Sequence, residues 1–88
     1  MATSPNLTKL ALLIDGENIS ATYMPLIMRE AGARGVVAIR RVYGHFKGTR
    51  MKAWTKQIEA FDLTPVNVSP ITLGKNAADL KLTIEAVD

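Results

Sequence analysis

The chain has 88 residues and a formal net charge of +3, and 48% of its residues are hydrophobic. This length allows one domain, the lack of cysteine excludes disulfides and thiolate–zinc sites, and the single histidine excludes a multi-histidine metal site. No apolar run reaches the roughly 18 residues that a transmembrane helix needs. With no cysteine and no signal peptide, we expect a cytoplasmic protein.

Positive charge is concentrated in the middle of the chain. Glu30 is the only acid between positions 29 and 56, where eight basic residues lie. Such a segment suits a polyanionic ligand, and an ordinary solvated surface explains it equally well. The basic residues are Arg29, Arg34, Arg40, Arg41, Lys47, Arg50, Lys52 and Lys56.

The predicted elements begin after a disordered leader at residues 1–7. The apolar run that ends at Asp15 indicates a buried strand over residues 8–15. A helix should follow to about residue 33, because Ser20 can cap it and Pro25 suits a first turn. We place Leu26, Ile27 and either Met24 or Met28 on its apolar side.

A second strand is predicted over residues 36–43, which are rich in β-branched side chains. A second helix over about 50–61 follows, and a short third strand is predicted over 64–68. The apolar stripe of the second helix recurs at helical spacing, which makes Trp54 a core residue rather than a ligand-stacking one. The stripe consists of Met51, Trp54, Ile58 and Phe61.

A third helix is predicted from Asn76 to the end of the chain, with Ala77, Leu80, Ile84 and Val87 at helical spacing. The resulting order is β-α-β-α-β-α, which predicts an α/β fold with a parallel sheet. We expect residues 8–88 to be the N-terminal part of one domain.

The candidate site begins with Asp15, at the carboxyl end of the first predicted strand, where open parallel sheets bind ligands. The carboxylate can instead close the following turn, and Asn18 can orient it or serve the turn alone. Asp79, early in the third predicted helix, could converge on Asp15, although an acid there also suits the helix dipole. Carboxylate and amide oxygens suit Mg²⁺ or Mn²⁺.

A second group of residues is predicted to bind nucleic acid, because aromatic side chains mixed with basic ones can stack bases and hold phosphates. For each of them an ordinary core or solvent-exposed role is the competing explanation. The group consists of Arg40, Arg41, Tyr43, His45, Lys47, Arg50 and Lys75.

Several segments together resemble the NYN domain, the PIN-like ribonuclease branch that includes the LabA-like bacterial proteins. They are LLIDGENI at 12–19, RRVYG at 40–44, Trp54, GKNAADLKL at 74–82, and Asp88. The resemblance implies a PIN-like three-layer sandwich with a metal-dependent ribonuclease site. Its catalytic and metal-binding residues would include Asp15, Asn18 and Asp79, with Asp88 as a further metal ligand.

The family pattern continues with a fourth strand and a Ser-x-Asp-x-Asp-Phe motif that is not found in this sequence. We therefore expect a sheet truncated before strands four and five and an incomplete acidic site. The first strand would then be an exposed edge, which predicts a homodimer or a segment swap through that edge.

Two functions remain open from the sequence. One is a Mg²⁺- or Mn²⁺-dependent endoribonuclease, and the other is a non-catalytic module of the same fold that binds single-stranded RNA. A dinucleotide-binding domain is disfavoured because no G-x-G-x-x-G follows the first strand. A receiver-like domain would need acids at several strand ends, and only the first strand ends in one.

Overall fold

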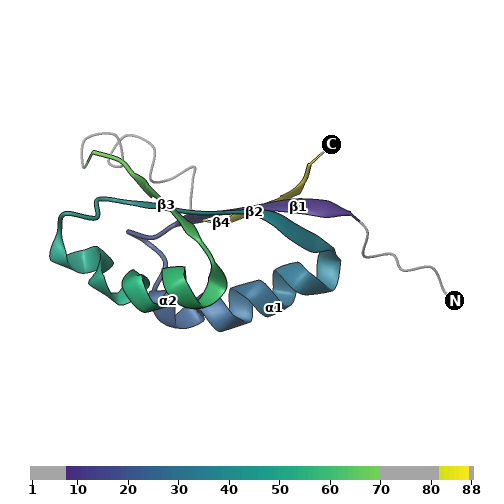
Figure 1. The fold of residues 1–88 in the computed structure, drawn as a ribbon, viewed down its shortest axis with the longest axis horizontal. Helices are drawn as coiled ribbons and strands as arrows, with labels where there is room; N and C mark the ends of the chain where they lie inside the picture. The colour runs from purple at the N-terminus through teal and green to yellow at the C-terminus, as the bar shows by residue number, and fades with distance from the viewer. Residues whose placement is uncertain (1–7, 70–81, 88) are drawn as a thin grey trace, which may run out of the picture.

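The computed structural model of the protein describes residues 8–69 and 82–87. In this part of the chain, four strands form one sheet in the order β3-β2-β1-β4, and both α-helices lie on the same face of it (Figure 1). The elements are β1 (Lys9–Asp15), η2 (Ala21–Tyr23), α1 (Met24–Arg34), β2 (Val36–Gly44), η3 (Thr49–Ala53), α2 (Trp54–Phe61), β3 (Thr64–Asn67) and β4 (Leu82–Ala86).

The first three strands are parallel, as predicted. β1 pairs with β2 from Lys9↔Val36 to Asp15↔Tyr43, and β2 pairs with β3 from Arg41↔Thr64 to Gly44↔Asn67. Helical crossovers join these strands, so the carboxyl ends of β1, β2 and β3 lie at one edge of the sheet. The loops that follow Asp15, Gly44 and Asn67 are thereby brought together.

The core lies between the sheet and the two helices. Alternation along β1 sends Leu12 and Ile14 toward the helices, and neither side chain is exposed to solvent. Trp54 from α2 meets them there and is 1% exposed, which confirms its predicted place in the core. In α1 the buried positions are Met24, Ile27 and Ala31. Leu26, predicted to be on the apolar side, is instead 46% exposed.

A bulge in β2 decides which arginine faces the helices. The register between β1 and β2 shifts after Leu10↔Val37, so Ala38 is an extra residue and Ala11 pairs with Ile39. Arg40 consequently lies on the helix side of the sheet, while Arg41 lies on the opposite face. We call this opposite side the open face, because no described helix covers it.

The predicted third helix is wrong for residues 82–86, which form the antiparallel strand β4. These residues also alternate with a period of two: Leu82, Ile84 and Ala86 lie on the helix side, and Thr83 and Glu85 lie on the open face. Pairing with β1 therefore satisfies the backbone and the apolar pattern together, and helical spacing alone did not reveal this alternative. Residues 70–81, which include the rest of that helix, lie outside the described residues, as does the leader at 1–7.

The prediction that β1 is an exposed edge is also wrong. β1 is an interior strand, because β2 pairs with one side of it and β4 with the other. A mixed sheet with two helices on one face is consistent with an α/β PIN-like fold. Within the described residues it has two layers and one antiparallel strand, so the predicted all-parallel sheet is corrected. None of the described helices has the length and hydropathy needed to span a membrane.

Candidate nucleic-acid-processing site

The loop after β1 is folded around Asp15. This carboxylate is fully buried, and it accepts hydrogen bonds from the Glu17 N–H (3.1 Å, to Oδ1) and from Asn18 Nδ2 (2.7 Å, to Oδ2). The Asp15 carbonyl accepts from the Asn18 and Ile19 N–H groups at 3.2 and 2.9 Å. Asp15 therefore closes the turn with its side chain, and Asn18 orients the carboxylate by its side-chain hydrogen bond.

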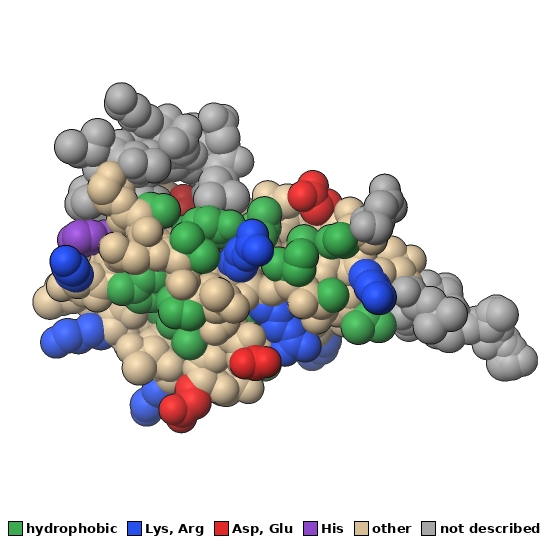
Figure 2. Space-filling view, turned by 45° about the horizontal axis from the view of Figure 1, so that its top comes forward, with side chains coloured by type: hydrophobic (Ala, Val, Ile, Leu, Met, Phe, Trp, Pro, Cys, Tyr) green, Lys and Arg blue, Asp and Glu red, His purple; other side chains and the backbone are tan. Residues whose placement is uncertain are grey.

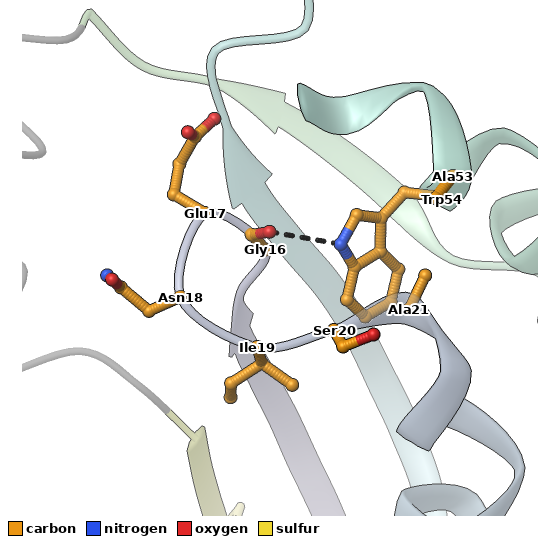
Figure 3. Close-up of a pocket in the computed structure, with 8 residues that line it drawn as sticks. All are labelled: Gly16, Glu17, Asn18, Ile19, Ser20, Ala21, Ala53 and Trp54. Atoms are coloured by element: carbon orange, nitrogen blue, oxygen red, sulfur yellow. Dashed lines mark hydrogen bonds between the residues drawn. The ribbon is translucent and has the colours of Figure 1, made fainter. Parts of the chain in front are cut away.

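Gly16 lets the layer of helices approach this loop closely. A Cβ atom at residue 16 would come within 2.5 Å of Met51 Cε and 2.9 Å of Val42 Cγ2. The buried Trp54 indole donates a hydrogen bond from Nε1 to the Gly16 carbonyl at 3.1 Å (Figure 3). Residues from η3 and α2 therefore hold the loop from the helix side, and the absence of a side chain at residue 16 makes the contact possible.

The loop after β2 is held from two sides. The Glu17 carboxylate accepts the His45 N–H at 2.8 Å, and Asn67 Oδ1 at the end of β3 accepts the Phe46 N–H at 2.9 Å. The Gly48 N–H then closes a turn onto the His45 carbonyl at 3.1 Å. Glu17 and Asn67 thus connect the carboxyl ends of three strands.

Sequence reasoning missed Glu17 and Asn67. Glu17 lies two residues after Asp15, which was the only available signal for it, and Asn67 carried no signal because its partner is distant in sequence. His45 Nδ1 is buried, and it has no hydrogen-bond partner among the described residues. A buried imidazole nitrogen without a partner is uncommon in folded proteins.

A shallow pocket of about 290 Å³ lies beside the first loop. It is lined by residues 16–21 together with Ala53 and Trp54 (Figure 3). In this view Glu17 and Asn18 extend from the loop away from the Trp54 ring. The loop therefore has one side packed on the indole and another side that presents polar side chains.

The oxygen atoms near Asp15 provide only part of the ligand set that a hard cation such as Mg²⁺ needs. A carboxylate has about four lone-pair positions, so Asp15 retains acceptor capacity beyond its two hydrogen bonds. Within the described residues, no cationic side chain contacts it, and no group of three histidine, cysteine or acidic side chains is arranged to hold a metal ion. Asp15 fits one ligand position of a Mg²⁺ or Mn²⁺ site. Asp79 and Asp88, the other predicted ligands, lie outside the described residues.

Some predicted nucleic-acid-binding residues lie close to Asp15 and one does not. Tyr43 is the register partner of Asp15 and is half-buried on the open face, and Arg41 is exposed on the same face two residues earlier. Arg40 faces the helices, where its guanidinium donates to the Phe61 carbonyl at 2.8 Å and to the Val37 carbonyl at 3.2 Å. This arginine completes the end of α2 and is turned away from the loop.

The remaining predicted residues follow β2 or lie outside the described part. His45 and Lys47 belong to the loop after β2, and Lys47 is exposed. Figure 2 shows a purple histidine side chain at the left end of the molecule with blue basic side chains near it. Arg50 lies in η3, but its side chain is not described, and Lys75 lies outside the described residues.

Comparison with known protein families supports the resemblance in the sequence. The NYN domain matches this chain over residues 9–88. Comparisons with curated proteins and with solved structures returned no match. The family match begins at the first residue of β1 and includes Asp15, Gly16 and Asn18. The chain therefore belongs to the NYN domain family, within the PIN-like nuclease superfamily.

Proposed function

We propose that this NYN domain acts on RNA as part of a metal-dependent endoribonuclease, with Asp15 as its first metal-binding carboxylate. The observation that carries the proposal is the Asp15 carboxylate. It is fully buried at the carboxyl end of an interior strand, has acceptor capacity left, and has no cationic partner among the described residues. A carboxylate removed from water in this way favours a compensating cation.

A bound Mg²⁺ or Mn²⁺ would supply an activated water and stabilise the leaving oxygen of a phosphodiester. Asp79 is the proposed second ligand, and Asp88 is a proposed third. Asn18 donates a hydrogen bond from its side-chain Nδ2 to Asp15 Oδ2 and would thereby fix the plane of the carboxylate. Its own carbonyl oxygen then remains available to a ligand at the exposed side of the loop.

Single-stranded RNA is the substrate that the surroundings of Asp15 favour. Arg41 and Tyr43 share the open face with Asp15, which would place a phosphate contact and a stacking surface beside the carboxylate. The loop after β2 adds Lys47 and His45, whose Nδ1 has no hydrogen-bond partner in the part of the chain that the structure describes. Because Glu17 and Asn67 hold this loop, its backbone would lose little entropy on binding.

The second candidate is an RNA-binding module without catalysis. The hydrogen bonds from Glu17 and Asn18 already give the Asp15 carboxylate a complete structural role in the turn, which favours this alternative. Both candidates predict RNA binding that weakens steeply with salt, because phosphate contacts release counterions. They differ in whether the RNA is cleaved and whether a divalent metal is required.

The test is cleavage and binding of a labelled single-stranded RNA by the purified chain, with Mg²⁺, with Mn²⁺ and with EDTA. The key variant is Asp15→Asn, which keeps an oxygen to accept the Glu17 N–H and lets the Asn18 amide turn over to offer its own oxygen. We expect metal-dependent cleavage, weak because part of the family's acidic motif is not found in this sequence, and we expect Asp15→Asn to abolish it while the far-ultraviolet circular dichroism spectrum is kept.

The matched control is Glu30→Gln, which removes one carboxylate from the exposed surface of α1, away from the loop. It should leave cleavage unchanged. Salt-sensitive binding without cleavage would select the RNA-binding module. If the chain neither binds nor cleaves RNA in any metal, both candidates are refuted.

A further inference from the structure

Glu17 connects the loop that contains Asp15 with the loop after β2. Its backbone N–H donates to Asp15 Oδ1 at 3.1 Å, and its carboxylate accepts the His45 N–H at 2.8 Å. We propose that Glu17 is a positioning residue whose side-chain length sets the spacing between Asp15 and the loop after β2, residues 45–48. RNA held by that loop then meets the Asp15 carboxylate in one fixed position, so the inference rests on the proposed function and extends it.

The backbone pairing of β1 with β2 stops just before Glu17. The Gly16 N–H donates to the Tyr43 carbonyl at 2.8 Å, which is the last backbone bond that the structure describes between these two segments. In a parallel ladder the next bond would join the His45 N–H to the Gly16 carbonyl. That carbonyl instead accepts the Trp54 indole N–H at 3.1 Å. The Glu17 carboxylate therefore replaces a backbone carbonyl as the acceptor for the His45 N–H.

This replacement lets the two loops diverge and still be held together. In Figure 3 the Glu17 side chain extends toward the chain that leaves β2, whereas the Gly16 carbonyl points to the indole. A glutamate carries its carboxylate beyond two methylene groups, so the length of this side chain decides how far apart the two backbones lie. The loop after β2 is a tight turn, closed by the Gly48 N–H on the His45 carbonyl at 3.1 Å, and it should follow such a change as a unit.

The surroundings of Glu17 favour a role through length over a role through charge. Among the described residues its carboxylate forms no ion pair, and the His45 N–H is its one hydrogen-bond donor. It also belongs to no described group of three acidic or histidine side chains that could hold a metal ion. Its negative charge would repel the phosphate groups of an RNA held at Lys47. A role through spacing, in contrast, uses the contact that the structure contains.

Asn67 holds the same loop from the side of β3 and provides the control. Its Oδ1 accepts the Phe46 N–H at 2.9 Å, and in the described part of the chain it forms no hydrogen bond with the loop that contains Asp15. Loss of this bond should loosen the loop after β2 without changing the spacing that Glu17 sets. Substitutions at the two residues should therefore have different effects, on the rate of cleavage at Glu17 and on RNA affinity at Asn67.

The test is a pair of substitutions that separate length from charge. Glu17→Gln keeps the length and an acceptor oxygen and removes the charge, whereas Glu17→Asp keeps the charge and retracts both oxygens by one methylene group. Hydrogen exchange of the metal-free chain, followed by NMR, gives the first readout. We expect the His45 amide to stay within about 3-fold of its wild-type exchange rate in Glu17→Gln and to exchange about 10- to 100-fold faster in Glu17→Asp.

Single-turnover cleavage of a labelled single-stranded RNA in Mg²⁺ or Mn²⁺ gives the second readout, and fluorescence anisotropy gives the RNA dissociation constant separately. Glu17→Asp should lower the rate constant at saturation about 10- to 100-fold and change the dissociation constant less than about 3-fold, because a misplaced RNA still binds but meets Asp15 in the wrong position. Glu17→Gln should keep the rate constant within about 3-fold of wild type. Asn67→Ala should instead weaken RNA binding more than it slows the saturated reaction.

The opposite order of the two variants would overturn the proposal. If Glu17→Asp cleaves like wild type and Glu17→Gln is impaired, Glu17 acts through its charge. Two variants that match wild type in both readouts would overturn it as well. A wild-type chain that neither binds nor cleaves RNA refutes the proposed function, and the exchange rates of His45 then decide by themselves whether Glu17 sets the spacing.

Discussion

The hydrogen bond from the Trp54 indole to Gly16 should be essential for the loop that contains Asp15. Trp54→Phe keeps an aromatic ring and removes only the donor and part of the ring. The Gly16 carbonyl is then left buried without its partner, at a cost of about 1–3 kcal/mol, and the smaller ring leaves a void that adds to it. We expect a total loss of about 2–4 kcal/mol, against about 4–13 kcal/mol for the free energy of unfolding of a domain this size.

Urea unfolding followed by far-ultraviolet circular dichroism measures this loss, since the variant has no tryptophan fluorescence. The control is Met51→Leu, which changes a neighbour of Gly16 with nearly constant volume and no hydrogen bond, and it should cost less than about 1.5 kcal/mol. Amide chemical shifts of Gly16, Glu17 and Asn18 should move more in Trp54→Phe than in the control. A Trp54→Phe variant within about 0.5 kcal/mol of wild type would refute this account of the loop.

Three further predictions follow from contacts around the loop. Gly16→Ala should destabilise the fold by about 1–3 kcal/mol in the same urea assay, because its Cβ would lie 2.5 Å from Met51 Cε. Arg40→Met should lower the free energy of unfolding by about 1–3 kcal/mol, because its hydrogen bonds to the Val37 and Phe61 carbonyls are lost, and it should leave RNA affinity unchanged. Arg41→Ala should instead weaken RNA binding, measured by fluorescence anisotropy, with little loss of stability. Glu17→Ala should raise the rate of amide hydrogen exchange in the loop after β2, because the His45 N–H loses its acceptor. Glu17→Gln keeps an oxygen as acceptor and should preserve the protection from exchange. Equal exchange rates in the two variants would contradict this role for Glu17.

The parallel part of the fold was predictable because it depends on local signals. The apolar run before Asp15, the caps and glycines around the first helix and the stripe through Met51 and Trp54 each lie within one short segment. The antiparallel strand at residues 82–86 was not predictable in this way. Its sequence supports either a helical or an alternating pattern, and the choice depends on the free side of β1, which is a long-range property.

The faces of β2 illustrate the same limit on a smaller scale. Arg40 and Arg41 are adjacent basic residues, and both were predicted to bind nucleic acid. The bulge at Ala38 turns the first toward Phe61 and leaves the second on the open face with Tyr43. A one-residue shift in register reverses every later side chain of a strand, and the residues from Val36 to Tyr43, around the bulge at Ala38, include no glycine or proline that would reveal it.

The hydrogen bonds to the Asp15 carboxylate come from neighbouring residues, whereas the contacts that fix the position of its turn come from residues distant in sequence. Both donors to the carboxylate lie within three residues of it, so the turn could form in many backbone contexts. What fixes its position are contacts from far along the chain, namely Trp54 to Gly16 across 38 residues and Glu17 to His45 across 28. A motif such as Asp-Gly-Glu-Asn therefore predicts a turn, whereas a site requires that α2 and the end of β2 dock on it. Substitutions in α2 should consequently impair the metal-dependent activity proposed for Asp15, even though the hydrogen bonds to the carboxylate come from Glu17 and Asn18 and not from α2.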